Sequence, residues 1–555
     1  IGKKMREVEV AGEELKSYAL DHHGIIAAVC KDLGIAKRID DRLNKKDPRR
    51  VVSAGIAAVA MVINGLGFTN RRLYLTPQFF ESKPIDRLLG SDISAKHLDD
   101  KALGKGLDDI SSYGSSRLFG ELAFDIALEN NLLSTLAHLD STSLSVTGEY
   151  DVASQENIVS LTYGHSKDHR PDLKQVMMSL VVSGKSAIPI WMEPHDGNTS
   201  DKKSFHETIK RVRDFQKQLK GCPDFKWIAD SALYSRDKLL KETSYLWLSR
   251  VPETITEARA LVEKPENEIL WVEREKGYKT ASFNSNYGDV DQRWLLIYSK
   301  QSYEREKKTF EKKLDKQESA LKKALWHLGN DVFSCEVDAL KEAKKIAKKF
   351  LYHDVEMTMI AVTKHKKTGR PKAGEAGEKI GVKIESTFKR NEASIEVFLN
   401  RKGRFILATN DLDDKNFSDQ HILEEYKQQQ NVERGFRFLK DPWFMVDSVF
   451  LKSPKRIEAL MMIMTLCLMV YNIAQYRLRE ALVEKKETLP NQINKPIKNP
   501  TMRWIFQIME GIGLVRFYEK NIEKPEREII TNLNELRRKI IRLLGRSAQE
   551  IYGIV

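Results

Sequence analysis

Three acidic residues stand where carboxylates can hold a metal ion. Asp140 directly follows the apolar run at 136–139, and Asp230 follows the mostly apolar run at 225–229. Because an aspartate at the end of a strand projects its carboxylate at the edge of the sheet, two neighbouring strands can present both groups to one divalent cation. Glu433, in a segment predicted to be helical, is the expected third ligand. Such an oxygen-only set favours Mg²⁺, whereas a turn or cap role is the usual alternative for a strand-end aspartate.

The predicted helix around Glu433 carries a polar stripe where a core helix would be apolar. Spacings of 3, 4, 4 and 3 residues place five side chains on one helical face: Tyr426, Gln429, Glu433, Arg437 and Lys440. One carboxylate among groups that donate hydrogen bonds to phosphate is what a metal-dependent enzyme that cleaves phosphodiesters needs. A solvated helix face with internal ion pairs is the alternative.

This stripe resembles a known signature. The pattern Tyr426-x2-Gln429-x3-Glu433-x6-Lys440 is similar to the Tyr-x2-Arg-x3-Glu-x6-Lys signature of insertion-sequence DDE transposases, with Gln429 in place of Arg. Arg437, one turn beyond Glu433, is expected to compensate. Other segments that resemble this group lie at 138–142, 163–175, 196–201, 228–234, 450–479 and 20–115. The resemblance therefore covers nearly the whole chain.

The resemblance implies a fold, a site and a reaction. It implies an RNase H-like catalytic core and a triad of Asp140, Asp230 and Glu433 that holds two Mg²⁺ ions, with Mn²⁺ as a substitute. Tyr426, Gln429, Arg437 and Lys440 would bind phosphates of the element ends. The implied reaction is cleavage of double-stranded DNA at terminal inverted repeats and joining of 3′-hydroxyl ends to target DNA by a homodimer on paired ends. Two alternatives stay open: a transposase-derived DNA-binding protein without catalysis, and a structure-specific nuclease without strand transfer.

Two further basic segments are candidates for DNA contacts. Lys167 and Arg170 lie between predicted strands, where they are expected to contact phosphates, although pairing with the interleaved Asp168 and Asp172 is the alternative. Residues 366–372 contain Gly-Arg-Pro and resemble an AT-hook core, in which Arg370 would enter the minor groove of A·T-rich DNA. A flexible basic linker is the alternative there.

Hydrophobic periodicity predicts the elements that position these residues. The N-terminal region reads as entirely helical, and residues 94–110 fit either a DNA-reading helix-turn-helix or a plain helical hairpin. Predicted strands lie at 136–139, 143–146, 176–182, 188–192, 227–228 and 245–248, with the three early strands antiparallel and the later ones parallel. Further strands are predicted at 381–384, 394–398 and 404–409. Predicted helices lie at 200–219, 236–242, 304–325, 340–350, 418–440, 457–484, 502–509 and 531–544.

The expected fold class is α/β, with an RNase H-like catalytic core interrupted by a large mixed α/β insertion and flanked by helical terminal regions. The expected domains are a helical DNA-binding domain (1–130), the first part of the core (131–251), a basic insertion (252–400), the second part of the core with the Glu helix (401–450), and a helical region for dimerisation or DNA contact (451–555).

Charge and composition favour a nucleic-acid partner. The 555 residues carry a net charge of +13, and residues 300–390 alone hold 23 Lys and Arg against 14 Asp and Glu. Nucleic acid is the leading partner and an anionic membrane surface the second. Four cysteines without a CxxC pair and no signal-like N-terminal segment favour a reducing, cytoplasmic setting at a bacterial or archaeal nucleoid. The apolar stretch at 459–476 is interpreted as a buried core helix, so no membrane contact is expected.

Overall fold

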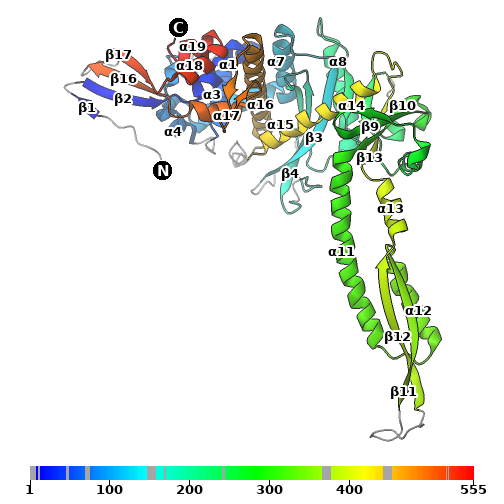
Figure 1. Cartoon of the computed structure of the whole chain (residues 1–555). Coiled ribbons are helices and arrows are strands. Elements are labelled where there is room, and N and C mark those ends of the chain that lie inside the picture. The colour runs from blue at the N-terminus through cyan, green and yellow to red at the C-terminus, as the bar shows by residue number, and fades with distance from the viewer. Residues whose placement is uncertain are drawn as a thin grey trace. The chain divides into compact units, whose positions relative to one another are not determined.

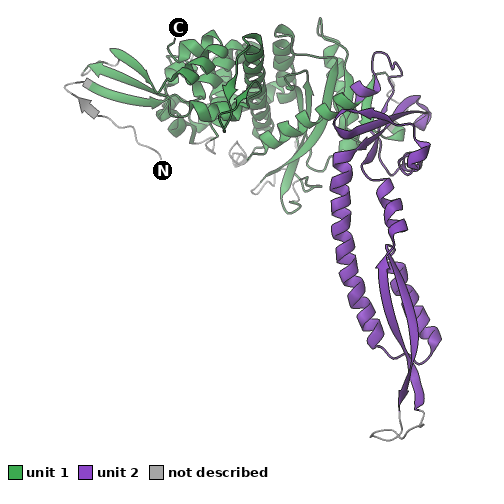
Figure 2. Ribbon diagram, viewed as in Figure 1, with its two compact units in different colours: residues 1–249, 423–555 green, residues 250–422 purple. Residues whose placement is uncertain are grey.

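The computed structural model describes residues 8–10, 13–44, 49–68, 75–146, 158–167, 170–239, 244–364, 377–441, 453–519, 522 and 524–554. The chain forms two compact units (Figure 2). One unit contains residues 1–249 and 423–555, and the other contains residues 250–422. The chain therefore leaves the first unit once and returns to it.

The first unit is built around a mixed sheet. Its strands lie in the order β5-β4-β3-β6-β7, with β3 (Leu136–Val146), β4 (Lys174–Ser183), β5 (Ile188–His195), β6 (Lys226–Ala229) and β7 (Trp247–Arg250). Pairing is antiparallel for β3–β4 and β4–β5 and parallel for β3–β6 and β6–β7, which confirms the predicted pairing. The two strands predicted at 136–139 and 143–146 are one strand, because β4 pairs with β3 along its whole length.

Helices cover both faces of this sheet. On one face, Gly120 of α7 (Ser115–Glu129) leaves room for the Trp191 ring. The centroid of that ring lies 5.5 Å from the ring centroid of Phe215 on α8 (Asp201–Gln216). On the other face, Gly435 of α15 (Gln430–Leu439) approaches Leu180 of β4 and Leu468 of α16 (Pro454–Glu484). Burial on both faces explains why β4 is a nearly continuous apolar run.

The helix α16 is the long apolar helix that the sequence predicts. In the described part of the chain it alone is long and apolar enough to cross a membrane, yet 83% of its most apolar window is buried. Its side chains pack against α3 (Ala54–Gly65), α6 (Asp100–Tyr113), α7 and β5. The interpretation as a core helix is confirmed.

The N-terminal region is not entirely helical, and the C-terminal region is not either. β2 (Glu13–Ala19) pairs with β16 (Gly513–Glu519) in a four-stranded sheet of order β1-β2-β16-β17, with β1 at Val8–Val10 and β17 at Arg527–Thr531. Figure 1 shows this sheet joining both ends of the chain. The remaining elements of these regions are α1 (His23–Asp32), α2 (Ile35–Leu43), α4 (Thr76–Glu81), α5 (Ile85–Leu89), β14 (Leu489–Pro490), β15 (Pro496–Ile497), α17 (Met502–Met509), α18 (Glu535–Leu543) and α19 (Arg546–Ile551).

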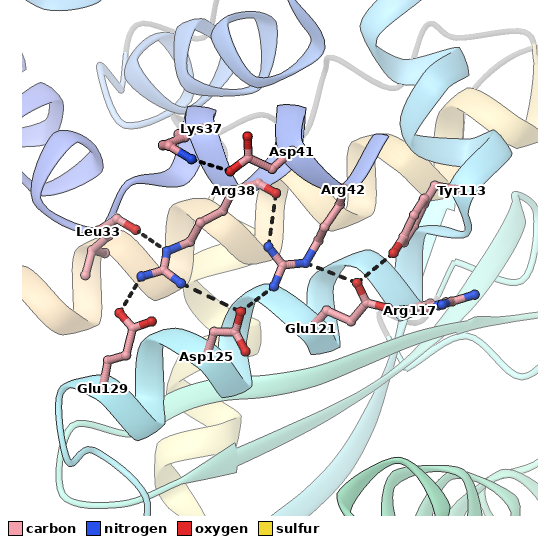
Figure 3. Close-up of polar contacts among 10 residues, drawn as sticks. All are labelled: Leu33, Lys37, Arg38, Asp41, Arg42, Tyr113, Arg117, Glu121, Asp125 and Glu129. Atoms are coloured by element: carbon pink, nitrogen blue, oxygen red, sulfur yellow. Dashed lines mark hydrogen bonds and ion pairs between the residues drawn. The ribbon is translucent and has the colours of Figure 1, made fainter. Parts of the chain in front are cut away.

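Ion pairs fasten α2 to α7 (Figure 3). Arg42 bonds both Glu121 and Asp125 on α7, and Arg38 bonds Glu129 one turn further along. The Tyr113 hydroxyl donates a 2.7 Å hydrogen bond to Glu121, which adds α6 to the network. The charged face of α2 is therefore a structural contact in this unit.

The segment 94–110 contains one α-helix that follows a single 3₁₀ turn. Its first part is only the 3₁₀ turn η2 (Ala95–His97), and Asp99 caps α6 by accepting a hydrogen bond from the amide of Ala102. A Cβ on Gly106 would lie 2.9 Å from the Ala57 side chain, so α6 is pressed against α3. The segment is therefore not the pair of helices that the sequence predicts, and α6 packs on α3 within this unit.

The second unit combines a small sheet with a helical and hairpin arm (Figure 1). The sheet strands lie in the order β13-β10-β9-β8. In the arm, leucines of α11 that share one face pack with α12 and the hairpin β11–β12, in a core that includes Leu321, Leu325 and Ile384. The bounds in this unit are α10 (Thr256–Val262), β8 (Val272–Arg274), β9 (Tyr278–Ser285), β10 (Gln292–Ser299), α11 (Lys300–Asn330), α12 (Glu336–Lys349), β11 (His353–Lys364), β12 (Glu378–Arg390), α13 (Glu392–Asn400) and β13 (Arg404–Thr409).

Two predictions in this part of the chain have different outcomes. The strand predicted at 394–398 is wrong, because α13 occupies it: Asn391 caps that helix through the amide of Ser394, and Ile395 is buried beside Phe310. The resemblance of 366–372 to an AT-hook, including Arg370, lies outside the described residues.

Candidate active site

Strand register brings Asp140 and Asp230 together. In the parallel ladder of β3 and β6, Leu139 pairs with Ala229, and each aspartate is the next residue. The Asp140 carboxylate accepts a 2.7 Å hydrogen bond from the amide of Ser141, and that of Asp230 accepts one of 2.9 Å from Ala232. Asp230 follows its strand as predicted, whereas Asp140 lies within β3, which continues beside β4.

The two carboxylates influence each other. Burial raises the pKa of Asp140 to about 7; the Lys167 ammonium opposes this rise, and the Asp230 charge adds to it. Burial also raises the pKa of Asp230, and the nearby charge of Asp201 adds to that rise. The pair is therefore costly to ionise without a cation.

Lys167 supplies a cation close to Asp140, because it bonds to Ser141, the next residue in sequence, and to Asp201. Its Nζ donates hydrogen bonds to the Ser141 carbonyl (2.7 Å) and the Ser141 hydroxyl (2.8 Å), and lies 2.9 Å from an Asp201 carboxylate oxygen. The Ser141 hydroxyl in turn donates to Asp201. The Lys167 ammonium thus bonds to Asp201 and to Ser141, the residue after Asp140, whereas Arg170 pairs with Asp172 at 2.7 Å on the exposed surface.

Two loops hold Lys167 and Asp201 in place. The Gln175 side-chain amide, which is 1% exposed, donates a 2.6 Å hydrogen bond to the Gly197 carbonyl. The amide of Gly197 donates to the Ser160 carbonyl at 3.1 Å. These bonds tie the loop that precedes Lys167 to the loop that precedes Asp201.

Gly197→Ala is expected to lower the free energy of unfolding by about 2–3 kcal/mol, because the added methyl group overpacks this junction. Its Cβ would lie 2.1 Å from the Gln175 carbonyl oxygen and 2.6 Å from that of Thr162. Denaturant titration measures the loss, with the exposed neighbour Asn198→Ala as control. Equal stability of the two variants would contradict the tight junction.

The helix α15 lies on the sheet face that carries Asp140. Gln429, between α14 (Asp419–Gln428) and α15, is 7% exposed and donates a 2.9 Å hydrogen bond to the Leu139 carbonyl. Its Oε1 lies 3.1 Å from Nδ1 of His138, and burial lowers the pKa of that histidine to about 4, so the neutral ring donates. Leu180 is the cross-strand partner of Asp140 on β4. A Cβ on Gly435 of α15 would lie 3.6 Å from the Leu180 side chain, so α15 packs on this face of the sheet.

The five residues of the predicted stripe do not share one environment. Gln429 is buried, whereas Glu433 and Arg437 are exposed and Tyr426 and Lys440 are half-buried. The predicted helix at 418–440 is two helices that meet at Gln429. The Gln429 side chain therefore anchors α15 to β3 in this conformation, and the exposed groups face solvent one and two turns beyond it.

A family model for the transposase DDE domain matches residues 134–470, more than half of the chain. The chain belongs to the DDE transposase family. A second model, a domain of unknown function (DUF4277), matches residues 15–124. Among solved structures, the cryo-EM structure of the piggyBac transposase synaptic complex with hairpin DNA is similar at 11% identity and a TM-score of 0.34, over 88% of this chain and 79% of that chain. No curated protein matches the chain.

DDE transposases generally use divalent metal ions, and the donors of this member suit one. Asp140 and Asp230 offer only oxygen atoms, which is the donor type that Mg²⁺ prefers. Within the described ranges, no three His, Cys, Asp or Glu side chains converge closely enough to hold a metal ion. Glu433, on the helix that crosses the Asp140 face, therefore does not close a three-carboxylate cluster with the two aspartates in this conformation.

Three residues that surround the aspartate pair were not predicted from the sequence. They are His138, two residues before Asp140, Ser141, the residue after Asp140, and Asp201, the last residue of the segment 196–201. Asp201 lies in a segment that resembles the family, and this place could have indicated it. An acidic residue at the start of a helix is, however, normally interpreted as a helix cap. Lys167 was predicted as a DNA contact, and its bonds to Ser141 and Asp201 were not foreseen.

Mn²⁺ binding to this transposase is expected to tighten as pH rises, because the metal must displace the Asp140 proton, whose pKa is about 7. The apparent Kd should fall roughly fivefold from pH 6 to pH 7, roughly tenfold from pH 6 to pH 8, and level off above pH 8. Without metal, stability changes with pH in the opposite sense. The unfolded Asp140 carboxyl ionises near its ordinary pKa of 3.8 and the folded one near 7, so the free energy of unfolding declines as pH rises between these values. Electron paramagnetic resonance of free Mn²⁺ measures the Kd; a Kd constant from pH 6 to 8 would contradict the raised pKa.

Proposed function

We propose that this chain is a cut-and-paste DNA transposase that cleaves the ends of an insertion sequence and joins their 3′-hydroxyl groups to target DNA. The observation that carries the proposal is the register of β3 and β6, which sets Asp140 beside Asp230. The strand order β5-β4-β3-β6-β7, antiparallel and then parallel, supports an RNase H-like core. The return of the chain to this unit after residue 422 supports an insertion ahead of the Glu433 helix.

The residues of the first unit divide the work of the proposed reaction. Asp140, Asp230 and Glu433 would hold two Mg²⁺ ions, with Mn²⁺ as a substitute. When bound, the metal activates the attacking water or 3′-hydroxyl and stabilises the leaving oxygen. The buried setting of Asp140 strengthens its electrostatic interactions, and Gln429 fixes the start of the helix that carries Glu433.

Several basic groups are proposed to hold the DNA substrate. Arg437 and Lys440 lie on and just after α15, beyond Glu433, and with Tyr426 they would contact phosphates of the terminal repeats. The arm of the second unit, within the strongly basic stretch 300–390, would grip the same DNA through salt-dependent phosphate contacts. A homodimer on paired ends, at a bacterial or archaeal nucleoid, completes the proposal.

The test is incubation of the full chain with DNA that carries the ends of its element, in Mg²⁺ or in EDTA, with a plasmid target. A denaturing gel separates the products by size. We expect Mg²⁺-dependent nicks at the element ends and, with the plasmid, joined products. Nicks without joining would instead identify a nuclease, and binding without nicks would identify a non-catalytic DNA-binding protein.

A further inference from the structure

We propose that the outer edge of β11 in the arm of the second unit is a docking surface for the same edge of a second copy of this chain. The two β11 strands would run antiparallel about a two-fold axis at Ile360, so that two hairpins join into one four-stranded sheet. The inference rests on the proposed function only for the use of the dimer, to which it gives a contact surface. The association itself needs neither DNA nor metal.

The strand β11 has a strand neighbour on one side only. Among the described residues its sheet contains β11 and β12 alone, side by side in the arm (Figure 1), and a bridge from Phe333 to Val382 occupies part of the outer side of β12. β11 is 12 residues long, about twice the length of a usual strand. The backbone amides and carbonyls along such an edge are ready to pair with another strand.

The middle of this edge lacks the features that normally keep edge strands apart. Residues 358–362 contain neither a charged residue nor a proline, and Ile360 among them is 40% exposed. The register against β12 shifts after Val362, whose partner is Gly381, while the next residue pairs with Lys379. The extra residue of this irregularity therefore belongs to β12, and β11 stays regular. A long, regular and apolar edge favours a partner strand over solvent.

The edge of β11 is complementary to itself when it is read in the opposite direction. With Ile360 opposite its copy, the other opposed residues are Met359 with Ala361, Thr358 with Val362, and Glu356 with Lys364. Apolar side chains then meet around the axis, and opposite charges meet at both ends. Such cross-strand pairs stabilise antiparallel strands, whereas like charges directly opposite each other destabilise them.

The two faces of the hairpin also agree with this pairing. Val355 and Met357 pack toward the core of the arm, whereas Glu356 and Ile360 lie on the other face. Each proposed pair joins residues of the same face, so the helices of both copies would cover one side of the joined sheet. A homodimer of this kind has the closed two-fold symmetry that is commonest among soluble oligomers.

DNA is the other occupant that a basic arm suggests, but the charges of this edge do not favour it. β11 carries two acidic residues, Asp354 and Glu356, and one lysine, Lys364. A strand with more acidic than basic side chains repels a phosphate backbone. The same charges suit a copy of the strand, because they alternate in sign across the proposed axis.

The proposal predicts a dimer of the full chain without DNA that Ile360→Lys disrupts. A strand edge is a small interface, so the wild-type Kd should be on the order of micromolar. Ile360→Lys sets two ammonium groups opposite each other and should raise this Kd at least about tenfold. Ile380→Lys, at a 51% exposed position on β12, is the matched control and should associate as the wild type does.

Sedimentation velocity over a concentration series measures each Kd. A wild type that stays monomeric up to about 100 μM would overturn the proposal. A dimer that persists unchanged in Ile360→Lys would overturn it as well, because the association would then use another surface.

An exchange of charges tests the register. Glu356 is exposed and lies 3.4 Å from Lys389 on β12, and Lys364 is also exposed, so neither substitution endangers folding. Glu356→Lys alone and Lys364→Glu alone each oppose like charges at both ends and should associate at least about threefold more weakly than the wild type. An equimolar mixture of the two variants opposes unlike charges at both ends and should associate as tightly as the wild type. A mixture that associates no better than its separate components would overturn the self-pairing of β11.

The outcomes distinguish this inference from the proposed function. Sedimentation is measured without DNA, so a chain that never cleaves element ends can still form the dimer through β11. Conversely, end cleavage by a chain whose association is unchanged in Ile360→Lys would leave the transposase proposal standing and remove the β11 edge as a docking surface.

Discussion

Replacing Asp140 or Asp230 by asparagine is expected to lower the rate of Mg²⁺-dependent end cleavage at least about 10³-fold, because each change removes a charged ligand from the proposed metal site. Binding to element ends should stay within about threefold of the wild type, since phosphate contacts come from basic groups elsewhere. Folding should also survive. Asparagine has nearly the same volume, and at Asp140 it removes a carboxyl whose ionised form is disfavoured by burial.

Single-turnover cleavage and gel-shift titration measure these two quantities. Asp172→Asn, at an exposed acid paired with Arg170, serves as the control and should cleave normally. Glu433→Gln should lose cleavage to the same extent, although its carboxylate is exposed in this conformation. Cleavage within tenfold of the wild type in either aspartate variant would remove that residue from the metal site.

The aspartate pair could be predicted from sequence because it depends on local pattern. Apolar runs of strand length ended at or near Asp140 and Asp230, and a parallel pairing of the two strands then sets their ends side by side. The structure adds the register, Leu139 opposite Ala229. No sequence pattern supplies that register, because it depends on how the helices pack on the sheet.

Contacts between residues distant in sequence were beyond prediction. β2 and β16 pair in one sheet although almost the whole chain separates them in sequence. The sequence around either strand therefore does not indicate its partner. The segment 394–398 has the residue types of a strand, but the Asn391 cap and the packing of Ile395 make it helical. Tertiary context overrides a weak local preference in such short segments.

The environment of the polar stripe around Glu433 also depends on contacts that the sequence does not show. Helical spacing correctly groups residues on one face of a continuous helix, but two helices meet at Gln429, and this amide is buried against β3. A glutamine is normally solvent-exposed, so its burial was not foreseen. The same holds for Lys167, whose partners Ser141 and Asp201 are far from it in sequence.

Gln429→Ala is expected to lower the rate of end cleavage by about 100-fold while leaving DNA binding nearly intact. The Gln429 amide bridges the Nδ1 of His138 and the carbonyl of Leu139, the residue before Asp140. Alanine leaves one buried donor and one buried acceptor unpaired, at a cost of about 1–3 kcal/mol each. It also releases the start of α15 from the strand that carries Asp140, and small misplacements of catalytic groups cost about this much in rate.

The neighbour Gln428 provides the matched control. Its side chain is exposed and accepts a 2.9 Å hydrogen bond from Asn431 on the surface, so Gln428→Ala should change neither rate nor stability appreciably. If Gln429 acts through the position of Glu433, then combining Gln429→Ala with Glu433→Gln should cost no more cleavage than Glu433→Gln alone, because the anchor is useless without its carboxylate. If the losses instead multiply, Gln429 acts independently of Glu433. A drop in DNA affinity equal to the drop in cleavage would show that the buried amide serves DNA binding, as the signature first suggested, and not the placement of the helix.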